Sequence, residues 1–236
     1  MARLIGFFAL VLCALFVLRE LPVIGALFRI PFVGFWLAAI TVSLVATRLA
    51  SLAVDRAKVR ALERRLGAVE TPHNQGKLGV LHASLRRHEQ AVACLERAAA
   101  GEPEFTEWHY RLGISRLALR DLDGARRAFE RALELCEDHA YGQALLRLCE
   151  TQTRTGLGSE ALAALVRFER ARGPTPESAY RRGLALRLLG DGLAAKAAFD
   201  EVGTLARGLA RYQQREGWRW SIRAWLARLT MLGTRG

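Results

Sequence analysis

The chain has 236 residues, 51% of them hydrophobic, so it is long and apolar enough to bury a sizeable core, as one domain plus an appendage. Its formal net charge is +12, and arginine carries nearly all of it, since only three residues are lysines. An excess of basic residues can indicate nucleic-acid binding. Here a general preference for arginine, together with a cluster of basic residues beside a predicted membrane segment, explains the charge more simply. We therefore expect no nucleic-acid partner.

Two apolar runs open the chain. Residues 4–18 carry no charge, and a second uncharged run extends from Phe32 to Thr47. A membrane-spanning helix needs about 20 residues, so each run alone is slightly short. Two interpretations stay open. In the first, which we favour, helices over 3–20 and 30–50 cross the bilayer as a hairpin, and snorkelling arginines extend the ends of the helices. In the second, the hairpin is re-entrant and crosses only in part.

The distribution of basic residues predicts the orientation of this hairpin. Six basic residues lie between Arg48 and Arg65, whereas the connection between the runs carries only Arg19 and Arg29. Because basic flanks remain on the cytoplasmic side, the part of the chain that follows the hairpin is predicted to be cytoplasmic. A cleaved signal peptide is the competing interpretation, but no small-x-small site follows the first run, and the second run would still anchor the chain.

Residues 51–70 are predicted to form a basic juxtamembrane helix. Leu52, Val59, Leu62 and Leu66 recur near helical spacing among basic residues. This segment is either a stalk that lays its arginines against anionic headgroups or a solvated spacer whose apolar side packs on the next segment. Thr71 and Pro72 then mark a turn and a new helix start.

Residues 71–202 contain one short pattern four times. A small residue is followed twelve residues later by alanine, and four residues after that by leucine or phenylalanine. The copies are Gly79, Ala91 and Leu95; Gly113, Ala125 and Phe129; Cys149, Ala161 and Leu165; and Gly183, Ala195 and Phe199. Two extra residues near Asp138 and His139 interrupt the spacing. A fixed period of this size indicates a stacked helical unit, in which small residues mark close helix crossings and large ones fill the gap to the next unit.

The 34-residue step of this pattern resembles the tetratricopeptide repeat (TPR) family, whose unit is a helix-turn-helix. Pro103 and Pro174 close the first and third units at or next to the family's proline position. The third copy departs from the family because Cys149 replaces the glycine, and the family's early Trp is absent from all four copies. The resemblance implies an all-α solenoid of about four helical pairs that binds a protein partner.

The order of apolar hairpin, basic stalk and TPR units is also similar to the layout of HemY-type bacterial inner-membrane proteins. This similarity covers arrangement rather than motif residues, so it implies a setting in the bacterial inner membrane and no activity. We therefore predict a transmembrane hairpin over 1–50, a juxtamembrane helix over 51–70, a cytoplasmic TPR solenoid over 71–202 and a C-terminal capping helix over 203–236.

The TPR resemblance implies that the first helices of the units line a concave groove, where extended peptides bind. In this register the candidate groove residues are Lys77, Tyr110, Arg111, Arg147, Arg154, Tyr180, Arg181 and Arg187. Arginine offers a planar fork for carboxylates and tyrosine a flat packing surface, so this row predicts an acidic peptide or a C-terminal carboxylate as the ligand. In the competing interpretation these arginines are ordinary surface residues, and Glu107 and Glu177 neutralise Arg111 and Arg181 from four residues away.

The C-terminal segment carries two apolar stripes. Leu205, Leu209 and Tyr212 have the spacing to cover the last apolar face of a solenoid. The second stripe is Trp218, Ile222, Trp225, Leu229 and Leu232, with Arg219, Arg223 and Arg228 around it. The segment is either a cap, as we predict, or an interfacial helix that lies at headgroup depth.

The sequence offers no pattern for catalysis. Its five histidines have no partners at metalloprotease spacing, and it contains no glycine-rich phosphate loop. Its four cysteines lack C-x-x-C spacing and histidine partners. We therefore expect a protein that is not an enzyme and has no metal or cofactor.

Taken together, the sequence predicts a membrane-anchored TPR scaffold that recruits a protein partner, with the lipid bilayer as its second contact. The competing hypothesis is a structural subunit of a larger bacterial membrane complex, which packs through its hairpin and repeats. Small residues such as Gly6, Ala9, Gly34 and Ala38 on the predicted hairpin would allow the close helix contacts that such a subunit needs.

Overall fold

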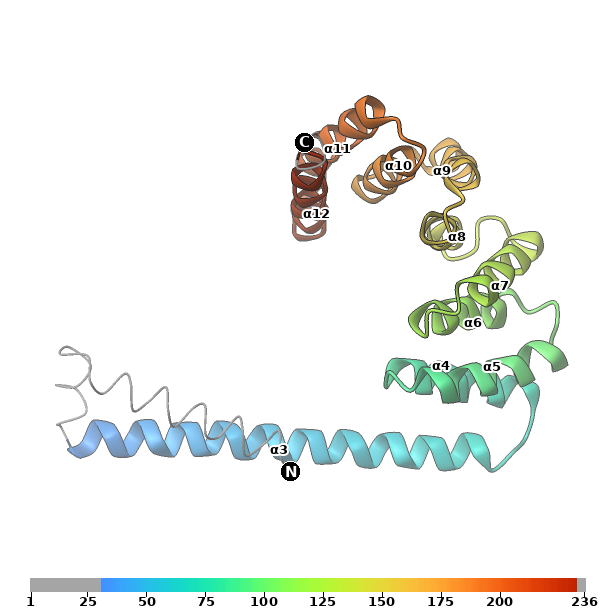
Figure 1. Ribbon diagram of the computed structural model, residues 1–236. Coiled ribbons are helices and arrows are strands. Elements are labelled where there is room, and N and C mark those ends of the chain that lie inside the picture. Colours follow the sequence, from blue (N-terminus) through green and yellow to red (C-terminus); the bar gives the residue numbers. More distant parts are fainter. Residues whose placement is uncertain (1–30, 233–236) are drawn as a thin grey trace. The chain divides into compact units, whose positions relative to one another are not determined.

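The computed structural model describes the backbone of residues 31–232 and the side chains of 40–49 and 57–230, and the regular secondary structure of this part is entirely α-helical (Figure 1). The chain divides into two compact units, Met1–Leu62 and Glu63–Gly236.

The first unit contains most of helix α3, which runs without interruption over Pro31–Gly67. The first predicted membrane span, residues 3–20, lies outside the described residues, and the second lies on α3. In the part of the chain that the structure describes, no helix is both long enough and apolar enough to cross a membrane. The side chains of Ile40, Val42 and Leu44 are 53–61% exposed.

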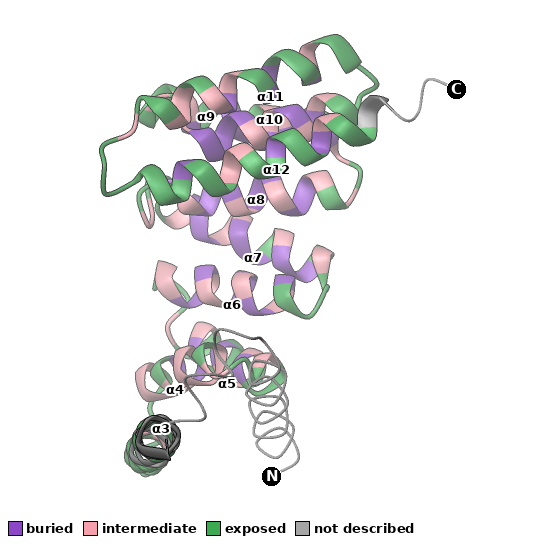
Figure 2. Cartoon of the chain, turned by 90° about the vertical axis from the view of Figure 1, so that its left-hand side faces the viewer, coloured by how far each residue is buried: buried purple, intermediate pink, exposed green. Residues whose placement is uncertain are grey.

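The second unit is a series of short helices. They are α4 (Pro72–Ser84), α5 (His88–Gly101), α6 (Thr106–Ala118), α7 (Leu122–Leu135), α8 (Gln143–Arg154), α9 (Gly158–Arg172), α10 (Pro176–Leu188), α11 (Gly192–Arg207) and α12 (Gln214–Leu232). Each helix packs mainly on its neighbours in the chain, most extensively within the pairs α4 and α5, α6 and α7, and α10 and α11. The packing of α11 on α12 and of α8 on α9 is next. Figure 2 shows the buried residues concentrated between these helices. The predicted all-α solenoid of four helical pairs is therefore confirmed.

The repeated small residues lie where the two helices of each pair cross. A Cβ atom added to Gly113 would lie 2.6 Å from the ring of Phe129, and one added to Gly183 would lie 2.5 Å from the ring of Phe199. All four alanines of the pattern are completely buried, as is Phe129. The crossings predicted from the 34-residue spacing are therefore confirmed.

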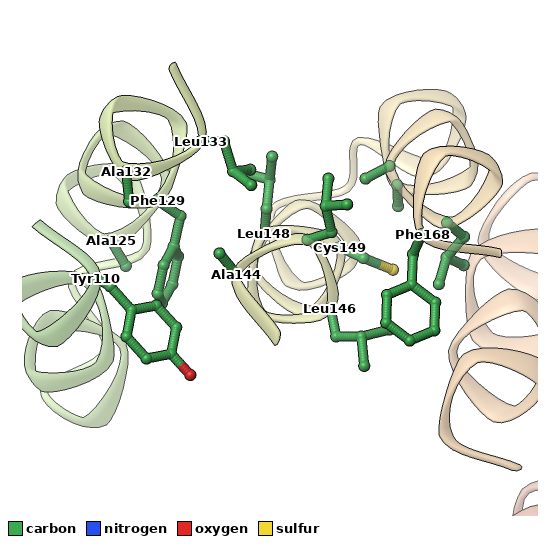
Figure 3. Close-up of a cluster of buried hydrophobic side chains, with 14 of the residues drawn as sticks. Tyr110, Ala125, Phe129, Ala132, Leu133, Ala144, Leu146, Leu148, Cys149 and Phe168 are labelled. Atoms are coloured by element: carbon green, nitrogen blue, oxygen red, sulfur yellow. The ribbon is translucent and has the colours of Figure 1, made fainter. Parts of the chain in front are cut away.

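In the third unit Cys149 takes the glycine position. Its side chain is completely buried, near Leu146 and Phe168 in the cluster that Figure 3 shows. Burial raises the pKa of the Cys149 thiol to about 11, so it is protonated at neutral pH. A protonated buried thiol behaves as a small apolar side chain, which explains why the unit tolerates cysteine here.

The two extra residues before the third unit change the backbone of the connection between α7 and α8. Ala140 and Tyr141 adopt left-handed conformations, with φ of 52° and 56°, and the side chain of Tyr141 is 80% exposed. Such conformations are uncommon for residues with a side chain. The guanidinium of Arg172 lies 5.4 Å from the centre of the Tyr141 ring and pairs with Asp138, which holds the connection on α9.

The C-terminal part continues the stacking. Helix α11 extends to Arg207, beyond residue 202, where the last unit was predicted to end. Helix α12 packs on α11 and α10, just as α10 packs on α9 and α8. It therefore occupies the place that the first helix of a fifth unit would take.

Two glycines of the last pair give a matched test of this packing. We expect Gly183→Ala to destabilise the protein by about 1–3 kcal/mol, because the new methyl group would overlap the buried ring of Phe199. Gly203 lies in the interior of α11, and a Cβ atom added there would lie 4.0 Å from its nearest neighbour, the guanidinium of Arg207. Gly203→Ala should therefore stabilise the protein by about 0.5–1 kcal/mol. Urea unfolding measures both changes, and equal effects of the two substitutions would contradict the close crossing.

Candidate functional site

Helices α8, α10 and α12 line a groove of about 750 Å³, which we call the α8–α10–α12 groove. The two helices that flank α10 are in contact with it, and Figure 2 shows α8, α10 and α12 on one side of the solenoid. Its lining residues are Gln143, Arg147, Glu150, Thr153, Arg154, Glu177, Tyr180, Arg181, Leu184, Glu216, Arg219, Trp220 and Arg223. Five arginines against three glutamates give this surface a net positive charge.

Glu150 on α8 organises the charges along one wall of the groove. Its carboxylate lies 2.9 Å from Arg147, 2.7 Å from Arg154 and 3.1 Å from Arg181. Burial alone would raise the pKa of Glu150, but the attraction of Arg181, Arg147 and Arg154 outweighs it, so this pKa is below its ordinary value. Glu150 is therefore ionised at neutral pH and holds three cations.

Arg181 is the buried member of this network. Its side chain is 7% exposed, and its Nη2 atom lies 2.6 Å from Glu177 and 3.1 Å from Glu150. Burial favours the neutral form of Arg181, but the attraction of Glu177 and Glu150 is stronger and raises its pKa. Because it bonds to acids on α8 and α10, Arg181 joins consecutive units and does not offer a free charge to a ligand.

The opposite wall of the groove, on α12, carries arginines that lack acidic partners in the described part of the chain. Among the described side chains, no acidic group pairs with Arg219 or Arg223. The guanidinium of Arg223 lies 4.6 Å from the centre of the Trp220 ring, and that ring lies 5.5 Å from the ring of Tyr180 on α10. The groove thus combines two unpaired cations with two neighbouring aromatic rings.

The predicted site residues fall into two groups. Arg147, Arg154, Tyr180 and Arg181 line the α8–α10–α12 groove together. The other four, Lys77, Tyr110, Arg111 and Arg187, are not among its lining residues, although Tyr110 interacts with Arg147 of the groove wall.

Each residue of the second group has its own surroundings. Lys77 is exposed on α4, and Tyr110 is buried with its ring 5.1 Å from that of His139. Arg111 donates to Glu107 at 2.5 Å, so the first of the two predicted neutralising pairs is present, as is the pair of Arg181 and Glu177. Arg187 donates to the hydroxyl of Thr230 on α12 at 3.1 Å.

Sequence reasoning did not place Arg219, Trp220 and Arg223 in the groove. The sequence analysis assigned the apolar side of this helix to the stripe that contains Trp218 and Trp225, which lies on the opposite face. A signal was available, because Trp220 shares its face with Ala224 and Ala227 at positions i, i+4 and i+7, and both alanines are buried. This second face indicates that the helix stacks on the preceding unit and so extends the groove.

The residues that line the groove do not form a recognisable metal-binding site. Within the described residues, no group of three or more His, Cys, Asp or Glu side chains could hold a metal ion. Every charged side chain on the groove's surface is an arginine or a glutamate. The arrangement is suited to binding a charged ligand through guanidinium groups.

Comparisons with known proteins agree with the repeat pattern. Residues 77–140 match the family model described as tetratricopeptide repeat, which confirms the predicted resemblance to TPR proteins. Comparison with curated proteins gives no match. The HemY-type layout stays a prediction.

Several solved structures are similar to this chain. MamA is 21% identical, with a TM-score of 0.55 over 60% of this chain and 77% of that one. TTC0263, a thermophilic TPR protein in Thermus thermophilus, is 18% identical, with a TM-score of 0.53 over 77% of this chain and 96% of that one. YrrB, a TPR protein with an unusual peptide-binding site, is 18% identical, with a TM-score of 0.51 over 70% of this chain and 93% of that one. At these identities the similarity shows the fold alone.

Proposed function

We propose that this TPR solenoid is a binding scaffold that holds an acidic segment of a partner protein in the α8–α10–α12 groove. One observation carries the proposal: Arg219 and Arg223, which lack acidic partners among the described residues, flank Trp220 on the groove wall. Unpaired guanidinium groups bind carboxylates through two parallel hydrogen bonds, and an adjacent indole accepts an apolar side chain of the same peptide.

The paired arginines have a different part in this proposal. Arg147, Arg154 and Arg181 are fixed by Glu150 and Glu177, so they shape the wall and hold its net charge positive. A ligand would not have to break these pairs in order to bind. The free energy of binding then comes mainly from the α12 side, where the cations do not have to leave an acidic partner.

A peptide fits this groove better than a compact ligand. The groove is open along the first helices of consecutive units, and extended peptides commonly bind such surfaces. The peptide-binding site named for YrrB belongs to a protein of the same fold. The net charge of +12 further favours association with acidic segments.

The proposal includes a membrane anchor at the N-terminal end, in a bacterial inner membrane with the solenoid on the cytoplasmic side. It is supported by the two uncharged apolar runs, by the exposed Ile40, Val42 and Leu44 on α3, and by the basic residues that follow. The alternative, a structural subunit of a larger membrane complex, would co-purify with membrane proteins in a fixed ratio.

Fluorescence polarisation with the full chain in detergent tests the groove. The probes are a fluorescein-labelled peptide rich in Asp, Glu and Phe and a matched peptide in which Lys replaces the acids. We expect Arg219→Ala/Arg223→Ala to weaken binding of the acidic peptide at least about tenfold, because each lost charged hydrogen bond contributes about 1.5–3 kcal/mol. The lysine peptide should bind neither protein.

Arg127→Ala/Arg170→Ala is the matched control for this experiment. Both of these arginines are exposed and lie outside the groove lining, so the control removes the same net charge elsewhere. Its affinity for the acidic peptide should stay close to that of the unmodified chain. Equal losses in the two double variants would mean that overall charge, and not the groove, determines binding, and the proposal would be rejected.

A further inference from the structure

Helix α12 exposes far more apolar surface than the other helices of the solenoid. Five of its large apolar side chains, which we call the outer stripe, are 36–66% exposed: Trp218, Ile222, Trp225, Leu226 and Leu229. In the described part of the chain, each of the helices α4 to α11 has at most one exposed large apolar side chain. The outer stripe is therefore a specific feature of α12.

The position of the outer stripe conflicts with a simple capping role. The opposite face of α12 is buried on the solenoid through Ala224 and Ala227. A terminal helix that only protects the solenoid from water presents a polar outer face. Here the outer face carries two tryptophans and three aliphatic side chains, so it requires an apolar environment that the described chain does not supply.

Charge next to the outer stripe indicates the kind of environment. Helix α12 carries four arginines and one glutamate, and of the arginines Arg228 pairs with Asp200 on α11. Arg215, Arg219 and Arg223 have no acidic partner among the described side chains and follow one another at four-residue intervals along the helix. An apolar stripe beside a row of unpaired cations is complementary to a surface that is apolar inside and anionic at its rim.

We propose that the outer stripe of α12 lies in the interfacial region of an anionic lipid bilayer. Indole rings favour the headgroup level, where the ring is apolar and its N–H group remains hydrated, and the aliphatic side chains enter the acyl boundary below it. The guanidinium group of Arg215, which is not among the groove's lining residues, then meets lipid phosphates.

A second copy of the chain is a poorer occupant of the same face. Two outer stripes packed against each other would bring two rows of unpaired arginines together, and like charges at short distance oppose such a contact. This lipid contact requires neither a ligand in the α8–α10–α12 groove nor a membrane-spanning N-terminal segment.

The test uses the full chain with vesicles whose phosphatidylcholine carries bromine atoms on its acyl chains, because bromine quenches tryptophan at short range. One set of vesicles contains the brominated phosphatidylcholine and phosphatidylglycerol in equal parts, and the other contains the brominated phosphatidylcholine only. The emission of the unmodified chain minus that of Trp218→Gln/Trp225→Gln isolates the two exposed tryptophans, because all other tryptophans are common to both proteins.

We expect the isolated emission to fall about twofold in the anionic vesicles and much less in the zwitterionic ones. The control Val166→Gln/Leu193→Gln, which alters two exposed apolar side chains on α9 and α11, should show the same quenching as the unmodified chain. Because Trp218 and Trp225 are 66% and 58% exposed, their replacement should leave the circular dichroism spectrum unchanged.

Two results would overturn the proposal. One is the absence of quenching of these two tryptophans in anionic vesicles. The other is a dimer of the unmodified chain in detergent that Trp218→Gln/Trp225→Gln converts to a monomer, since a second copy would then cover the stripe. Peptide binding measured on the same variant separates this proposal from the function of the groove, because the substitutions leave the groove lining intact.

Discussion

Arg181→Met is expected to reduce the free energy of unfolding by about 3–5 kcal/mol at neutral pH, because it removes one partner of a buried ion-pair network. The Arg181 side chain is 7% exposed and bonds to Glu177 on its own helix and to Glu150 on α8. Without it, Glu177 remains 9% exposed and loses its cation, whereas Glu150 keeps Arg147 and Arg154. Urea unfolding of the full chain in detergent measures the loss.

A double-mutant cycle serves as the control. Arg181→Met/Glu177→Gln removes the charge that the single variant leaves unpaired, so it should recover a substantial part of the lost stability. If the double variant is as unstable as the sum of the two single variants, Arg181 and Glu177 do not interact in the way the structure describes.

The single variant Arg181→Met should also change how the stability of the protein depends on pH. The pKa of Glu150 is lowered in the folded protein, so its contribution to stability is complete above the unfolded value of about 4.5 and is lost as the pH falls through the folded pKa. The unmodified chain should therefore lose stability below about pH 4.5, and Arg181→Met should lose less over this range, because Glu150 retains fewer favourable partners. A larger acid loss in the variant would have the wrong sign.

Phe129→Ala is expected to cost about 3–5 kcal/mol, through lost apolar burial and the cavity left behind. The ring of Phe129 is completely buried against Gly113 and lies 6.1 Å from the ring of Tyr110 (Figure 3). Because each unit contacts its neighbours, the loss should spread to the second and third units, where amide hydrogen exchange should become faster.

Phe105→Ala provides the matched control, since that ring is 43% exposed in the connection before α6. Its removal should cost about 1 kcal/mol, because less apolar surface leaves contact. A cost for Phe129→Ala no greater than that for Phe105→Ala would contradict the role of Phe129 as a core residue packed at the crossing of α6 and α7.

The solenoid could be predicted from the sequence because its defining contacts are local. Gly183 and Phe199 are sixteen residues apart and meet within one helical pair, so a constant spacing of small and large residues is enough to indicate the crossing. The connection before α8 was recognised for the same reason, since two extra residues near Asp138 displaced an otherwise regular pattern.

The charge state of the groove was harder to predict because it depends on contacts between units. Arg181 and Glu150 are 31 residues apart, and the sequence does not indicate that one carboxylate would hold arginines from two helices. The predicted row of arginines therefore contained members with different surroundings. Arg219 and Arg223 were missed as groove residues because they follow the last copy of the 34-residue pattern, where the period no longer indicates which face points into the groove.

Photo-crosslinking of the full chain in cells tests the central claim most directly. A benzoylphenylalanine residue at Tyr180, on the wall of the α8–α10–α12 groove, should crosslink to a partner peptide whose sequence, read by mass spectrometry, is rich in Asp and Glu. The same probe at Tyr212, which is 84% exposed outside the groove, should not capture that peptide. Capture of the same acidic segment from Tyr212 but not from Tyr180, or a segment without acidic residues at Tyr180, would contradict the account.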